Sequence, residues 1–177
     1  MGQGYKVHCR DCGYGISANL GVGFRFPMVY QETMEAARAG QYGEEIRRFL
    51  EEHPEGTLNT ETVLLQCTGC GHLECGPDLS MYVRRPDAPV GKKGRWSVEF
   101  PYEGAEYVSP TELKKDGAYE FVGRGHSCRE CGKPMKPISA SDLDRLLREN
   151  CYEPCRAGIP GPESGKPLWI ENHIMWD

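Results

Sequence analysis

The sequence predicts a mixed α+β protein built from two small modules with short antiparallel strands, a helical insertion in the first module and one helix in the second. The 22 glycines and 13 prolines make up about a fifth of the 177 residues, which indicates many turns and short elements. Most of the nine cysteines occur in closely spaced pairs, and one long stretch has the apolar periodicity of a helix. Only 38% of the residues are apolar, so we expect a modest hydrophobic core.

The charge pattern argues against a chain that binds nucleic acid over its whole surface. The 26 acidic side chains outnumber the 21 basic ones, and a net charge of -5 is a poor match for a phosphate backbone. Basic side chains gather in residues 84–95, where proline and glycine interrupt any regular element: Arg84, Arg85, Lys92, Lys93 and Arg95. We interpret this segment as a solvated linker between the modules; a flexible anion-binding strap is the alternative.

The cysteines form a threefold repeat of the pattern CxxCG. The three pairs are Cys9/Cys12, Cys67/Cys70 and Cys128/Cys131. Two intervening residues let a tight turn point both sulfurs at one ion, and the following glycine permits the positive φ that such a turn often needs. This repeat predicts metal binding more strongly than it predicts disulfides or a single redox pair.

A fourth, looser pair, Cys151/Cys155, brings the total to eight thiolates, the number that two tetrahedral zinc sites require. A structural zinc site contributes roughly 10 to 16 kcal/mol, comparable with the whole net stability of a domain. We therefore expect two structural zinc ions. Cys75 is left over, and we interpret it as a small buried hydrophobe or an exposed spare.

Four pairs can be grouped into two sites in three ways. Joining Cys9/Cys12 with Cys67/Cys70, and Cys128/Cys131 with Cys151/Cys155, encloses 54 residues (13–66) and 19 residues (132–150). Logarithmic loop entropy favours this local pairing over the interleaved one by about 2 kcal/mol. The local pairing also leaves each module self-contained on its side of residues 84–95.

Histidines stand close to three of the pairs, at His8, His72 and His126. A site with three thiolates and one imidazole therefore stays open, although outer-shell or surface roles are favoured for all three side chains.

The first module spans residues 1–83. We predict strands at 5–8 and 13–17 on either side of the first turn, a helical insertion at about 27–52 that splits near Gly40 and Gly43, and strands at 62–66 and 78–83. The insertion carries Tyr42, Ile46, Phe49 and Leu50 at helical spacing.

The second module spans residues 96–177. Short strands are predicted at 96–100, 106–108 and 118–122, and a helix capped near Ser139 or Asp142 extends to Asn150. The apolar tail at 167–176, with Trp169 and Trp176, predicts a terminal strand on the core; an exposed docking segment is the alternative.

The CxxCG pairs resemble the knuckles of zinc ribbons and rubredoxin-like proteins, and Cys9-Arg-Asp-Cys12-Gly13-Tyr14 is similar to a rubredoxin first knuckle. The overall layout also resembles small bacterial zinc-ribbon proteins. The resemblance covers about thirty residues around the turns and implies structural zinc, or iron in the same thiolate cages.

We expect a metal-structured adaptor or regulator that recognises another macromolecule, a protein before a nucleic acid, because four thiolates leave zinc no open position for a substrate. The alternatives are an iron electron-transfer protein, and a thiol sensor in which Cys75, or Cys151 with Cys155, is reactive. No HExxH or paired-carboxylate motif indicates an enzyme. No apolar run of eighteen residues and no secretory h-region is present, so we expect a cytoplasmic protein without a membrane span.

Overall fold

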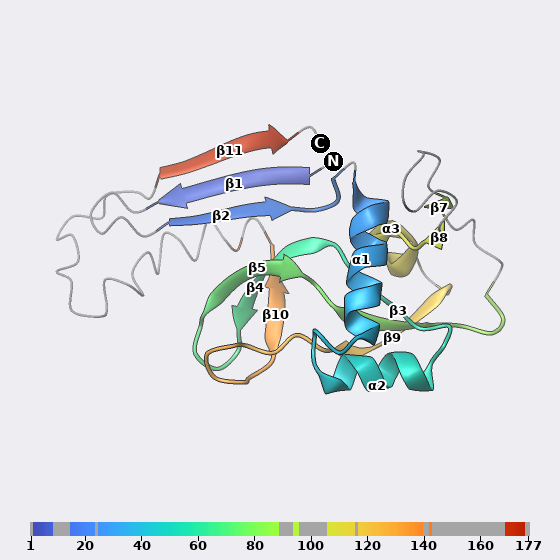
Figure 1. Ribbon diagram of the computed structural model, residues 1–177. Helices are drawn as coiled ribbons and strands as arrows, with labels where there is room; N and C mark the ends of the chain where they lie inside the picture. The colour runs from blue at the N-terminus through green and yellow to red at the C-terminus, as the bar shows by residue number, and fades with distance from the viewer. Residues whose placement is uncertain are drawn as a thin grey trace.

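The computed structural model describes residues 2–8, 15–23, 25–88, 94–95, 106–115, 117–139, 142 and 169–175. Within these ranges the chain is a mixed α+β protein, as the sequence predicts. The described strands form three sheets of three strands and one of two, all with antiparallel pairing, and three described helices accompany them (Figure 1). No helix in these ranges is both long and apolar enough to cross a bilayer.

The first sheet brings the two ends of the chain together. Its strand order is β11-β1-β2, with β1 at Gly2–His8, β2 at Gly15–Leu20 and β11 at Trp169–Met175. β1 is the central strand, and His8 at its end pairs with both Gly15 and Trp169. The predicted strands beside the first turn and in the tail are confirmed, and β2 extends to Leu20, beyond the predicted end at residue 17.

The helical insertion forms as predicted, as two helices. α1 spans Phe26–Arg38 and α2 spans Glu44–Glu52. Gly40 and Gly43 lie between them with φ of +81° and +101°, a backbone conformation that glycine adopts most easily. The buried side chains of α2 are Ile46, Phe49 and Leu50, as the periodicity predicts.

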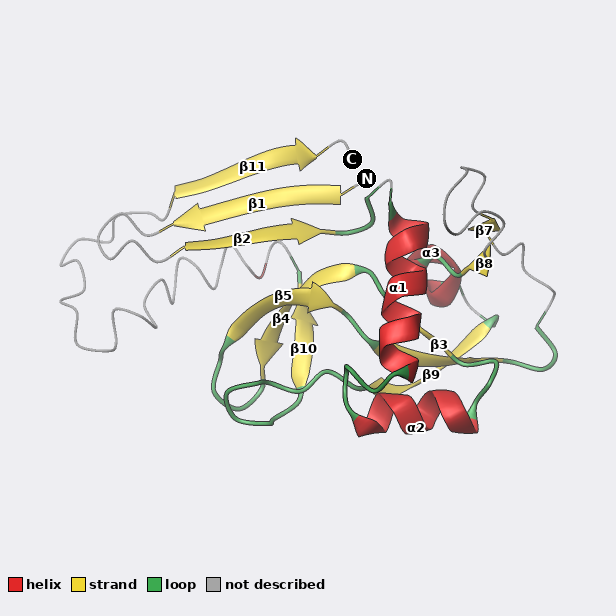
Figure 2. Ribbon diagram, in the orientation of Figure 1, coloured by secondary structure: helices red, strands yellow, loops and turns green. Residues whose placement is uncertain are grey.

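A second sheet, of order β3-β6-β9, packs with these helices (Figure 2). β3 is Thr57–Leu58, β6 is Ser80–Arg84 and β9 is Tyr119–Arg124. The short elements that precede β9 are β7 at Gly94–Arg95, β8 at Glu106–Tyr107 and α3 at Pro110–Lys114. Val108 and Leu113 belong to the same core cluster as α1, α2 and β6, so residues on both sides of segment 84–95 share one core.

The third sheet carries the cysteines, in the order β10-β4-β5. β4 is Thr62–Cys67, β5 is Leu73–Pro77 and β10 is Met135–Ile138. β4 is the central strand, and Met135 of β10 pairs with Cys67 of β4. A small second core lies here, made of Leu65, Cys67, Cys128 and Met135.

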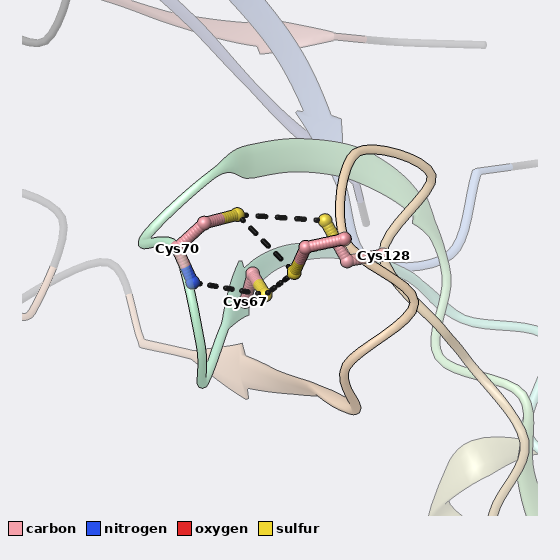
Figure 3. A group of neighbouring side chains, drawn as sticks. Cys67, Cys70 and Cys128 are labelled. Atoms are coloured by element: carbon pink, nitrogen blue, oxygen red, sulfur yellow. Dashed lines mark hydrogen bonds between the residues drawn. The ribbon is translucent and has the colours of Figure 1, made fainter.

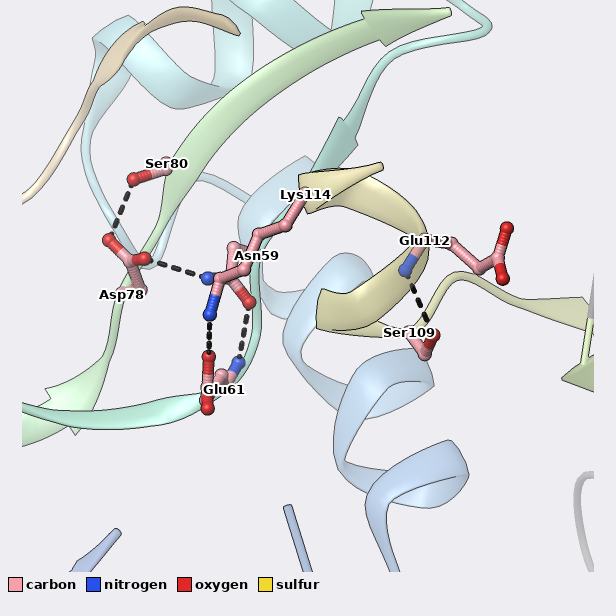
Figure 4. A network of polar contacts seen from close by, with 7 residues as sticks. All are labelled: Asn59, Glu61, Asp78, Ser80, Ser109, Glu112 and Lys114. Carbon is pink, nitrogen blue, oxygen red and sulfur yellow. Dashed lines mark hydrogen bonds and ion pairs between the residues drawn. The ribbon is translucent and has the colours of Figure 1, made fainter. Parts of the chain in front are cut away.

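A buried polar corner at residues 78–80 joins the cysteine-bearing sheet to the helical core. The Asp78 carboxylate accepts hydrogen bonds from Asn59 Nδ2 and from Ser80 Oγ, both at 2.7 Å (Figure 4). Leu79 lies between them with a φ of +55° and is the non-glycine residue with a positive φ in the described ranges. Because both carboxylate oxygens have donors, the buried charge of Asp78 is satisfied within the corner.

Two sheets cross the module boundary that the sequence predicts. β4 pairs with β10, and β6 pairs with β9, so each sheet takes strands from both sides of residues 84–95. A second metal module is not shown among the described residues. The strand predicted at 96–100 and, apart from Asp142, the helix predicted up to Asn150 lie outside them.

Candidate metal centre

The turn at Cys67–Cys70, called the first knuckle from here on, is stabilised by its own backbone hydrogen bonds. The Cys67 N–H donates to the carbonyl of His72 at 2.9 Å, and the Gly71 N–H donates to the carbonyl of Cys67 at 3.2 Å. Gly71 has a φ of +76°, which a side chain would strain. The glycine after the second cysteine therefore lets the chain return to β5.

The turn at Cys128–Cys131, called the second knuckle, repeats this arrangement. The Cys128 N–H donates to the carbonyl of Lys133, and the Gly132 N–H donates to the carbonyl of Cys128, both at 2.8 Å. Gly132 has a φ of +69°. The shared CxxCG pattern thus produces the same local backbone at two places in the chain.

The two knuckles face each other and bring four sulfurs together (Figure 3). The Sγ atoms of Cys67, Cys70, Cys128 and Cys131 all lie within 4.8 Å of one another. The Cys131 Sγ lies 3.4 Å from that of Cys67 and 3.6 Å from that of Cys70, and the Cys70 and Cys128 sulfurs are 3.7 Å apart. Zinc–sulfur bonds of about 2.3 Å in a tetrahedron place the sulfurs about 3.8 Å apart. The cluster therefore fits a tetrahedral thiolate metal site.

Contacts between the knuckles hold them in this position. Thr68 of the first knuckle donates from its backbone N and its Oγ1 to the carbonyl of Pro134, at 3.1 and 2.8 Å. A Cβ on Gly69 would lie 2.7 Å from Lys133 Cγ and 3.6 Å from the sulfur of Cys131. A side chain at position 69 would therefore require Lys133 to shift, and glycine lets the two turns approach without this adjustment.

Each knuckle contributes one buried and one exposed cysteine. Cys67 and Cys128 are 3% exposed and belong to the small core, whereas Cys70 and Cys131 are exposed. The first cysteine of each pair therefore joins the site to the protein interior, and the second faces solvent.

The surroundings of the cluster lower the pKa of one thiol, Cys67, and raise that of another, Cys70. The N–H groups of Cys70 and Gly69 lie 3.4 and 3.3 Å from the Cys67 sulfur and lower the pKa of Cys67 to about 6. The His72 N–H lowers the pKa of Cys70, but desolvation and the three nearby thiols together raise it to about 12. The group therefore ionises readily once, and further negative charge needs a cation.

A partly buried carboxylate connects β5 to the second knuckle. Glu74 Oε1 lies 3.8 Å from His126 Nε2 and 3.5 Å from Arg129 Nη2, and the side chains of Glu74 and His126 are 17% and 10% exposed. Arg129 lies between the two cysteines of the second knuckle. Glu74 thereby connects the two halves of the site without being part of the sulfur cluster.

Neither His72 nor His126 is a member of the cluster, whose four members are all cysteines. Cys75 also lies apart from it, on β5 opposite Leu64 of β4. Desolvation raises the pKa of Cys75, against the effect of a hydrogen bond from the Asn19 backbone N–H.

The structure corrects the predicted grouping of the cysteines. Cys67/Cys70 lie with Cys128/Cys131, so the local pairing is wrong for both of these pairs. The observed site encloses 57 residues (71–127), close to the 54 of the predicted first site, so loop entropy hardly opposes it, and Leu65 and Met135 are both buried where β4 meets β10. The other four predicted ligands, Cys9, Cys12, Cys151 and Cys155, lie outside the described residues.

The sequence reasoning did not identify two residues that shape this site, Gly69 and Glu74. The glycine inside the Cys67–Cys70 turn is a usable signal, because only a small residue allows a second turn to approach. Glu74 carries no signal of its own in the sequence.

Comparison with protein-family models, curated proteins and solved structures finds no match to this chain.

Proposed function

We propose that Cys67, Cys70, Cys128 and Cys131 hold one zinc ion whose role is structural. The observation that carries this proposal is the convergence of four sulfurs, and of no imidazole or carboxylate within the described residues, at tetrahedral spacing. Four thiolates fill the coordination shell of zinc and leave no position for water or substrate. The ion would fasten the β4–β5 hairpin to the turn before β10.

Iron in the same cage is the second candidate, because tetrahedral thiolates bind either metal. Elemental analysis of freshly purified protein identifies the metal. The visible absorption spectrum also separates the two, since Fe(III)-thiolate absorbs visible light and Zn(II) does not. We expect colourless protein with stoichiometric zinc. Coloured protein with stoichiometric iron would instead indicate electron transfer.

The prediction of a second zinc ion now rests on Cys9/Cys12 and Cys151/Cys155, which the first site leaves over. Elemental analysis of the wild type and of a Cys9→Ser/Cys12→Ser variant tests it. We expect two zinc ions in the wild type and one in the variant; one ion in both would remove the second site.

We propose that the metal-stabilised fold serves as an adaptor for another protein. An exposed apolar pair on β9 supports this choice: Phe121 and Val122 are 50% and 51% exposed. The register of β9 against β6 shifts beside them, between Met81 and Tyr82, because Met81 pairs with Gly123 and Tyr82 pairs with Phe121. Such a β-bulge re-aims side chains, and solvent-exposed apolar pairs of this kind suit protein contacts.

The adaptor proposal is tested on zinc-loaded protein by crosslinked capture from its source cells. Phe121→Ser/Val122→Ser is the test variant, and Val29→Ser is the control at another exposed apolar residue. We expect the partner to be lost only in the double variant. Captured nucleic acid that the protein protects from nuclease would favour nucleic-acid binding instead.

A further inference from the structure

The four cysteines of the metal centre differ in how easily a reagent dissolved in water can reach them. Cys67 and Cys128 are 3% exposed and belong to the small core, whereas Cys70 and Cys131 are exposed. The Cys67 sulfur is also held by the N–H groups of Gly69 and Cys70, at 3.3 and 3.4 Å. Such a reagent therefore meets Cys70 and Cys131 first.

The two accessible cysteines lie against each other, although they come from different knuckles. Their Sγ atoms are 3.6 Å apart. The other short sulfur contact of each leads to a buried cysteine, from Cys131 to Cys67 at 3.4 Å and from Cys70 to Cys128 at 3.7 Å (Figure 3). A disulfide needs its sulfurs about 2.05 Å apart, so a movement of about 1.5 Å would join Cys70 to Cys131.

Bound zinc would keep these cysteines in their reactive form. A thiol that coordinates the ion is deprotonated, and the thiolate is the form that attacks an oxidant. Exposure then decides which thiolates react, because oxidation is selective for accessible sulfurs.

We propose that Cys70 and Cys131 form a reversible disulfide between the knuckles when the zinc-loaded protein meets a peroxide, and that the zinc ion then leaves. This regulation rests on the zinc site proposed above. It makes the metal centre a redox-sensitive switch whose two states are a zinc-bound tetrathiolate and a metal-free disulfide.

The chemistry needs only the peroxide and two protons from solvent. One thiolate attacks a peroxide oxygen, the O–O bond breaks, and a sulfenic acid and hydroxide form. The second thiolate attacks the sulfenic sulfur, the S–O bond breaks, and a second hydroxide leaves as the S–S bond forms. The two sulfurs lose two electrons, and the peroxide gains them and becomes two water molecules. Cys67 and Cys128 remain as thiols, too few to hold zinc.

The new bond would replace the ion as the link between the knuckles. Zinc would fasten the β4–β5 hairpin to the turn before β10, and a disulfide from Cys70 to Cys131 spans the same two segments. A thiol reductant would open it and restore the zinc site. Disulfides formed within each knuckle would instead leave the two turns unlinked.

Disulfide mapping of the zinc-loaded, full-length protein after hydrogen peroxide treatment distinguishes these products. Trypsin cuts after Arg129 and so places Cys128 in peptide 125–129 and Cys131 in peptide 130–145, whereas Cys67 and Cys70 share peptide 49–84. We expect a bond between peptides 49–84 and 130–145, which fragmentation assigns to Cys70 and Cys131. Bonds confined to single knuckles, or a bond from peptide 49–84 to peptide 125–129, would overturn the proposal.

Zinc release is measured with a chromogenic chelator in the Cys9→Ser/Cys12→Ser variant, in which this site alone is expected to hold zinc. We expect peroxide to release about one ion per chain and a thiol reductant to restore binding. Zinc that stays bound in a millimolar excess of peroxide would refute the switch. Protein that contains no zinc before peroxide is added would instead refute the structural-zinc role, so the two failures are distinguishable.

Cys75→Ser is the matched control, because Cys75 shares peptide 49–84 but lies apart from the cluster. The variant should form the same disulfide and release zinc at a rate within about twofold of the wild type. Loss of the disulfide from this variant would show that Cys75 is the reactive residue and would contradict the assignment.

Discussion

Replacing Gly125 with alanine tests whether the two sides of segment 84–95 share one core. A Cβ at position 125 would lie 2.3 Å from Ile46 Cγ1 and 2.5 Å from Ile46 Cδ1. Ile46 lies on α2 and has no exposed surface, so it cannot move aside into solvent. Gly125 is not among the glycines with positive φ, and the added methyl therefore tests packing alone.

We expect Gly125→Ala to lower the free energy of unfolding by about 2–3 kcal/mol, the upper part of the range for overpacking a core. Ile46→Ala alone should cost about 2–5 kcal/mol because it leaves a cavity. In the double variant the new methyl occupies part of that cavity, so the combined loss should fall short of the sum by at least about 1 kcal/mol.

Urea unfolding in zinc-saturated buffer measures these differences. Gly76→Ala is the control, because its Cβ would make only an ordinary contact of 3.7 Å with His126. The control should be neutral or slightly stabilising. If the losses of unfolding free energy in the two single variants add to that of the double variant within about 0.5 kcal/mol, Gly125 and Ile46 do not pack together. That result would refute a core shared by the two sides of segment 84–95.

Three further predictions concern the metal centre. Cys67→Ser and Cys128→Ser should each release the same single zinc ion, which elemental analysis measures; release of different ions would refute the observed grouping. Glu74→Gln should weaken zinc binding about tenfold in a chelator competition, since outer residues position the ligands, and the exposed Glu130→Gln should not. Zinc binding to this site should strengthen as pH rises because zinc displaces thiol protons, and at pH 7 Cys67 should contribute little to the protons released, because its pKa is lowered to about 6. Calorimetry in buffers of different ionisation enthalpy counts these protons, and a count of four would contradict the shift at Cys67.

Local features were predictable because their cause lies within a few residues. The knuckle turns follow from the CxxCG spacing, and α2 follows from the periodic placement of Ile46, Phe49 and Leu50. α3 was missed although its signal is present: Ser109 precedes Pro110, and its Oγ accepts the backbone N–H of Glu112 at 3.2 Å.

The missed strands β3, β5 and β10 owe their conformation to their partners more than to their own residues. β5 contains Gly76 and Pro77, and β10 contains Pro137, all unfavourable in an isolated strand. Pro137 is tolerated because β10 is an edge strand of its sheet. The cysteine grouping depends on these same strands, so an estimate from chain length alone could not find it.

The corner at residues 78–80 determines how far the loss of a metal ion can travel through the molecule. The Leu79 N–H donates to the carbonyl of Asn59, and the Asn59 N–H donates to the carbonyl of Ser80, both at 2.9 Å. These bonds surround the Asp78 carboxylate, which itself accepts two hydrogen bonds. Because so many short hydrogen bonds hold it, this corner behaves as a rigid connection rather than as a hinge. Loss of the ion would therefore act first on the two knuckles, while this corner keeps the cysteine-bearing sheet attached to the helical core for as long as both remain folded.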